Sequence, residues 1–151
     1  CILNGPLRSA LLRHRVWWVR RPLDADAMAK AAGHLQGQHD FSAFRAAECQ
    51  AGTATRDISR LTVRREGPWL RVDVTANAFL HHMVRNIVGT LAVVGRGDAG
   101  PEWVAGVLAG RDRRAAGMTA PAAGLYLVHV DYGEALDQPP SLPPPGFATA
   151  T

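Results

Sequence analysis

The sequence is poor in lysine and cysteine. Lys30 is the only lysine, so arginine accounts for all other members of the 17 Lys and Arg residues. The two cysteines, Cys1 and Cys49, form no CxxC pair, which disfavours a zinc site or a dithiol redox motif and fits a reducing cytoplasm. No apolar run reaches the length of a transmembrane helix, so we expect no membrane partner.

Positive charge is present in modest excess. The 17 basic residues outnumber the 13 acidic ones, which gives a formal net charge of +4. A GC-rich genome explains the scarcity of lysine best, but the net charge still favours contact with RNA or DNA. We expect some of the arginines in loops or on polar strand faces to contact phosphates, namely Arg8, Arg13, Arg15, Arg45, Arg64, Arg65 and Arg113.

The length and the hydrophobic content of 47% suit one domain with a packed core. Two segments that alternate apolar and polar residues, 56–65 and 69–76, flank a Gly-Pro turn and predict a β-hairpin. The alternation slips once, between Ile58 and Leu61. Further strands are expected at 1–3 and 125–132. The short apolar segment 16–19 should be buried, and 39–45 should be irregular.

Three helices are predicted, at 24–36, 79–95 and 101–109. Asp24 is a suitable N-cap for the first, and Pro101 suits the first turn of the third. A hairpin combined with these helices indicates an α+β fold, with an antiparallel or mixed sheet and helices on one face. We expect a domain over 1–133 and a proline-rich tail over 134–151.

The helix at 79–95 is the most informative segment. At about 100° per residue, one face collects apolar side chains, and His81 and Arg85 lie on its flank. Gly89 costs roughly 1 kcal/mol against alanine inside a helix, so we expect another segment to approach it closely. Spacing alone favours a solvated surface position for Arg85, in a salt bridge. Adjacent histidines cannot chelate one metal well, and no metal is expected. The apolar face comprises Leu80, Met83, Val84, Ile87, Val88 and Leu91.

The segment NAFLHHMVRNIVG, residues 77–89, closely resembles the signature of the tRNA pseudouridine synthase A family. Three other blocks follow the order and the separations usual in that family, so the resemblance extends over roughly 1–132. They are HDFSAFR at 39–45, GPWLRVDVTANAF at 67–79 and GLYLVHVDY at 124–132.

This resemblance implies an enzyme that isomerises uridine to pseudouridine in the anticodon arm of tRNA without a cofactor. The target base must leave the stem to be reached, and the family flips it out. The resemblance also implies a cytoplasmic homodimer, with tRNA spanning both subunits.

The family uses an essential aspartate, an arginine that pairs with it, and a tyrosine that lies against the base. Arg85 matches the arginine, whose two-pronged contact would orient the carboxylate and keep it ionised. Leu125 and Tyr126 lie in the block that resembles the apolar wall of the uracil pocket. The residues that we expect to contact the substrate are His81, His82, Asn86, Phe41, Arg45, Leu125 and Tyr126.

The sequence also departs from the family. The block like GRTDAGVH that carries the aspartate is absent, and so is the tyrosine. GRGDAG at 95–100 resembles that block, but it follows the helix and lacks the next valine and histidine, so Asp98 is not expected to be catalytic. Because the chain starts at Cys1, we expect the C-terminal half of an enzyme, inactive alone. Alternatives are a noncatalytic RNA-binding module and a structural α+β domain with another partner.

Overall fold

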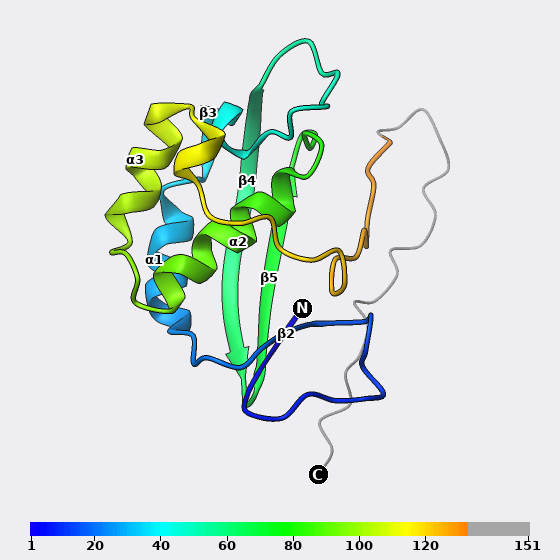
Figure 1. Cartoon of the computed structure of the whole chain (residues 1–151). Helices are drawn as coiled ribbons and strands as arrows, with labels where there is room; N and C mark the ends of the chain where they lie inside the picture. The colour runs from blue at the N-terminus through cyan, green and yellow to red at the C-terminus, as the bar shows by residue number, and fades with distance from the viewer. Residues whose placement is uncertain (133–151) are drawn as a thin grey trace.

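A computed structural model describes residues 1–132. A five-stranded mixed sheet, in the order β2-β1-β5-β4-β3, carries its helices on one face (Figure 1). This arrangement confirms the α+β fold. The strands are β1 (Ile2–Asn4), β2 (Trp17–Val19), β3 (Gly37–Asp40), β4 (Thr55–Glu66) and β5 (Trp69–Ala76). The helices are α1 (Ala25–Gly33), α2 (Met83–Gly95) and α3 (Glu102–Gly110), with short 3-10 turns η1 (Ser42–Phe44) and η2 (Arg113–Ala115).

The predicted hairpin is the centre of the sheet. Strands β4 and β5 pair in antiparallel register, and the register shifts between Ile58 and Arg60, where the alternation slips in the sequence. Beyond the bulge, residues that face each other share one side of the sheet. Leu61 opposite Val74 therefore points to the helices, whereas Arg64 opposite Arg71 points to the uncovered face.

The strands outside the hairpin are shorter, and the sequence predicted them less well. Strand β1 runs parallel to β2 and antiparallel to β5, and its buried Ile2 lies opposite Leu70. The expectation of irregular structure over 39–45 was partly wrong. Its first two residues belong to β3, which pairs with Thr55–Ile58 of β4. The polar sequence of β3 has no strand pattern, so its conformation depends on this pairing.

Helix α1 confirms the predicted cap. The Asp24 carboxylate accepts hydrogen bonds from the backbone N–H groups of Asp26 and Ala27, both at 2.9 Å. The helix ends at Gly33, earlier than expected, and the following residues make shorter-range turn bonds. Leu35 is nevertheless fully buried, so the apolar spacing that extended the prediction continues past the helix.

Helix α2 begins at Met83, four residues later than predicted. His82 adopts a left-handed conformation with φ 60°, which interrupts any helix running through it. Leu80 is 3% exposed, so it extends the apolar periodicity although it precedes the helix. The two histidines therefore lie in the turn before α2 and not on its flank.

The expectation of a final strand at 125–132 was wrong. Within the described residues this segment joins no strand ladder, and its apolar side chains are exposed, including Leu127 at 74% and Tyr132 at 53%. Alternation identifies the faces of a strand but does not supply the neighbour that it needs. The proline-rich tail predicted at 134–151 lies outside the described residues.

Candidate active site

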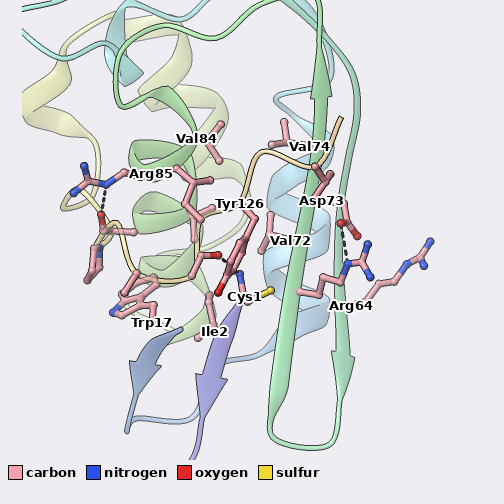
Figure 2. A pocket seen from close by; sticks show the side chains of 18 of the residues that line it. Cys1, Ile2, Trp17, Arg64, Val72, Asp73, Val74, Val84, Arg85 and Tyr126 are labelled. Carbon is pink, nitrogen blue, oxygen red and sulfur yellow. Dashed lines mark hydrogen bonds and ion pairs between the residues drawn. The ribbon is translucent and has the colours of Figure 1, made fainter. Parts of the chain in front are cut away.

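A cavity of about 310 Å³ lies beside β5, where the strand is no longer covered by β1 (Figure 2). Its walls come from several parts of the chain, including Cys1, Ile2 and Trp17 at one end and Arg60 and Arg64 of β4. Strand β5 contributes residues from Arg71 to Thr75, helix α2 contributes Val84, Arg85 and Val88, and the segment 120–128 closes another side. Segments far apart in sequence thus meet around one space.

The buried face of helix α2 differs in part from the apolar face that the sequence predicted. Val84 and Val88, which belong to that apolar face, are half-buried and line the cavity, although Val88 also packs against the core. The polar residues Asn86 and Thr90, at 1% and 0% exposed, face the interior instead. Periodicity located the apolar stripe but could not reveal that buried hydrogen bonds admit two polar side chains beside it. The apolar members of the buried face are Met83, Ile87, Leu91 and Val94.

Arg85 reaches from α2 to the segment that closes the cavity. Its Nε donates a hydrogen bond to the Ala120 carbonyl at 2.7 Å, and the Ala120 N–H donates to the Arg85 carbonyl at 3.1 Å. Within the part of the chain that the structure describes, the two Nη atoms of Arg85 make no hydrogen bond or ion pair. The outer edge of the guanidinium is therefore free to meet an anion in the cavity.

Leu125 and Tyr126, which the resemblance assigns to an apolar wall of the uracil pocket, line the same cavity. The Tyr126 hydroxyl donates a hydrogen bond to the Arg15 carbonyl at 2.7 Å, and the Cys1 amino group donates to the Gly124 carbonyl at 2.9 Å. These contacts anchor the segment to β1 and to the loop before β2. Figure 2 shows Tyr126 between Arg85 and β5.

Among the described residues that line this cavity, Asp73 is the one carboxylate. Alternation along β5 turns Val72 and Val74 toward α2 and turns Asp73 to the uncovered face. There it pairs with Arg71 at 2.8 Å, on the other side of the strand from Arg85 (Figure 2). Asp98 lies beyond the far end of α2 and pairs with Arg21 and Arg96. Neither carboxylate contacts Arg85.

The other five predicted substrate residues are not among those that line the cavity. Phe41 is 0% exposed and packs against Phe44, and Asn86 is equally enclosed. Arg45 is half-buried and donates a hydrogen bond to the Cys49 carbonyl. The structure therefore shows Phe41 and Asn86 as interior residues that support the fold around α2.

His81 and His82 stack on each other, with ring centroids 3.9 Å apart and an interplanar angle of 30°. The expectation that they belong to the helix was wrong, because the left-handed His82 changes the direction of the chain. Partial burial, the neighbouring His81 and the Arg85 charge lower the pKa of His82. The neutral ring is thus favoured at physiological pH.

The arginines predicted to contact phosphates fall into two groups. Arg65 and Arg113 bind protein groups: Arg65 donates to Asn4 Oδ1 and the Leu23 carbonyl, and Arg113 binds the segment before Ala120. Arg45 also binds a protein group, the Cys49 carbonyl. These internal roles left no trace in the sequence pattern. The exposed members are Arg8, Arg13, Arg15, Arg64 and also Arg65.

Arg60 and Arg71 line the cavity with Arg64, although no sequence motif marks them. The pairing of Arg64 with Arg71 puts both on the uncovered face of the hairpin. The alternation of the two strands contained this information once the register was known. Over residues 1–132, no three metal-binding side chains cluster, and none of the described helices has the length and hydropathy needed to cross a membrane.

Residues 31–133 match the family model described as tRNA pseudouridine synthase. The chain is 56% identical over 138 residues to a tRNA pseudouridine synthase A of Hydrogenovibrio crunogenus. The aligned region covers 91% of the chain and 53% of that protein. It is 52% identical over 136 residues to the protein of the same name from Burkholderia multivorans, covering 90% and 50%. The chain spans about half the length of the curated relatives it matches.

Proposed function

Because this chain belongs to the tRNA pseudouridine synthase family, we propose that it forms the arginine-bearing half of a complete synthase. The complete enzyme would isomerise uridine to pseudouridine in the anticodon arm of tRNA, without a cofactor. This chain would supply the guanidinium and one wall of the uracil pocket, and the catalytic carboxylate would come from the other half.

The observation that carries this proposal is the state of Arg85. One of its nitrogen atoms is fixed by the Ala120 carbonyl, while both Nη atoms lack a partner among the described residues. A guanidinium that is oriented but not neutralised is suited to a carboxylate, which it can bind with two parallel hydrogen bonds. Among residues 1–132, the cavity beside it offers no carboxylate that pairs with Arg85, since Asp73 is paired on the other face.

The reaction breaks the bond between C1′ of the ribose and N1 of uracil, turns the base and forms a bond from C1′ to C5. The C5 proton is then lost and N1 carries a proton. A carboxylate beside C1′ must remain ionised to take part, and the adjacent Arg85 charge would lower its pKa. Val84, Val88 and Leu125 would give the detached uracil an apolar wall against which to turn.

The tRNA backbone would be held by basic side chains outside the cavity. The uncovered face of the hairpin carries Arg60 and Arg64, and the loop before β2 carries Arg8, Arg13 and Arg15, all of them exposed. Such residues bind phosphates independently of sequence. We further propose a cytoplasmic homodimer in which tRNA contacts both subunits. His81 and His82, in the turn before α2, and Arg45, which follows η1, remain proposed substrate contacts.

A chimaera tests the proposal directly. This chain would replace the matching half of the Hydrogenovibrio crunogenus relative, and pseudouridine would be measured in unmodified tRNA. We expect turnover with the natural Arg85 and loss of most turnover, with the fold retained, in Arg85→Lys, because lysine lacks the two-pronged contact. Arg114→Lys is the matched control, since the Arg114 side chain is 91% exposed and pairs with Asp112.

Near-normal turnover in Arg85→Lys would reject the role of Arg85. Tight tRNA binding by a correctly folded chimaera that forms no pseudouridine would favour the noncatalytic RNA-binding module instead.

A further inference from the structure

Arg85 is held by a segment that is itself held by a polar network inside the protein. We propose that Arg113, Thr119 and Asn86 are positioning residues that fix the guanidinium of Arg85 in its catalytic orientation. This inference rests on the proposed function of Arg85 and adds residues that touch neither the cavity nor the reacting atoms.

Asn86 is the centre of the network. It follows Arg85 on α2 but points into the interior, where it is 1% exposed. Its amide nitrogen donates to the Phe44 carbonyl at 2.7 Å, and its Oδ1 accepts from Thr119 Oγ1 at 2.6 Å and from Arg113 Nη2 at 3.0 Å. One buried amide thus connects η1, α2 and the segment after η2.

Arg113 binds two residues of the segment after η2 as well as Asn86. Its Nη2 also donates to Thr119 Oγ1 at 2.9 Å, and its Nη1 donates to the Gly117 carbonyl at 2.9 Å. The fork of a guanidinium can make these contacts together, which a lysine ammonium on a flexible stem cannot reproduce. The charged group of Arg113 therefore binds groups of this chain and not a phosphate.

The backbone of residues 117–119 also lies in close contact with α2. The Gly117 N–H donates to Thr90 Oγ1 at 3.0 Å. A Cβ built on Gly89 would lie 1.7 Å from the Met118 carbonyl oxygen, and one on Gly117 would lie 2.7 Å from the Gly89 carbonyl oxygen. Two glycines therefore let residues 117–119 lie directly on α2, and the next residue is Ala120.

The position of the Ala120 carbonyl is consequently fixed by the contacts of Thr119, its immediate neighbour. That carbonyl is the sole hydrogen-bond acceptor of the Arg85 side chain in residues 1–132. If the network is loosened, Ala120 can move and the guanidinium can turn away from its partner. A displacement near 1 Å can cost roughly a hundredfold in rate when geometry is critical.

The test compares Thr119→Val with Thr119→Ser in the chimaera described above. Valine has nearly the same shape but no hydroxyl, whereas serine retains it. We expect kcat to fall roughly 10- to 100-fold in Thr119→Val with KM for tRNA little changed, and Thr119→Ser to restore most of kcat. Arg113→Lys should behave like Thr119→Val, and Arg114→Lys should behave like the unmodified chimaera.

Two readouts separate positioning from simple stabilisation. With Arg85 displaced, the pKa of the carboxylate that it pairs with rises, so the acidic limb of the kcat profile moves to higher pH. In the 151-residue chain, the Arg85 Nε–H signal in nitrogen-15 NMR should shift and exchange faster with water in Thr119→Val. Loss of thermal stability with an unchanged kcat, pH profile and Nε–H signal would overturn the proposal.

The outcome can be told apart from failure of the proposed function. If Arg85→Lys retains turnover, the catalytic assignment fails, whatever Thr119→Val does. If Arg85→Lys abolishes turnover and Thr119→Val leaves kcat at its full value, only the positioning inference fails. If both hold, the defects of the two variants should not add in the double variant, because they act through one guanidinium.

Discussion

Arg85 and Ala120 bind each other twice, side chain to carbonyl at 2.7 Å and backbone N–H to carbonyl at 3.1 Å. This reciprocal pair connects the helix that carries the catalytic candidate with the segment that closes the cavity. The orientation of Arg85 therefore depends on residues far along the chain.

The close approach at Gly89 predicts a stability defect in Gly89→Ala. The added methyl group would collide with the Met118 carbonyl, 1.7 Å from the ideal Cβ position. We expect a loss of about 1–3 kcal/mol in the free energy of unfolding, as for other overpacked sites. Urea unfolding of the chain measures it.

Gly106→Ala is the matched control for this prediction. Gly106 lies inside α3, and a Cβ there meets no atom within 4 Å. Alanine should then be neutral or stabilising by up to about 1 kcal/mol. Equal stability of the two variants would contradict the close packing of residues 117–119 on α2.

The division of the arginines predicts two kinds of binding defect. Replacing Arg8, Arg13 and Arg15 together with glutamine should weaken tRNA binding by the chimaera and flatten its dependence on salt, because fewer counterions are released. Arg65→Gln should instead lower the stability of the fold, since its guanidinium joins Asn4 to the Leu23 carbonyl. Binding titrations at several salt concentrations and thermal unfolding separate these effects. An unchanged salt slope in the triple variant would show that this loop does not contact phosphates.

The stacked histidines predict a titration that NMR can follow. His82 should titrate below the ordinary value of 6.5, because partial burial, His81 and Arg85 all disfavour its charged form. Since the pKa of the folded state is then the lower one, the unfolded state binds more protons in that window, and stability falls as pH drops through it. His81→Gln should raise the pKa of His82. A His82 pKa above 6.5 in the unmodified chain would be inconsistent with the stacked arrangement.

How far the sequence predicted the structure depended on the kind of interaction. Strong local signals were sufficient for the hairpin with its slip after Ile58 and for the Asp24 cap. The left-handed His82 and the pairing of β3 depend on tertiary contacts, and periodicity did not reveal them.

The residues of the candidate site likewise differ in how far the sequence predicted them. A motif placed Arg85 and Tyr126, which the fold brings to one cavity. The burial of Asn86 could not be read from its spacing, because it depends on hydrogen-bond partners 27 to 42 residues away in sequence.

The central proposal is that this chain supplies Arg85 to a carboxylate that belongs to the other half of the enzyme. The most direct measurement is the amount of pseudouridine formed in unmodified tRNA by residues 1–151 alone, beside the chimaera. We predict no product from the chain alone and turnover by the chimaera. Turnover by the chain alone, at a rate comparable to the chimaera, would contradict the claim and would direct attention first to Asp73, the carboxylate at the cavity, before Asp98.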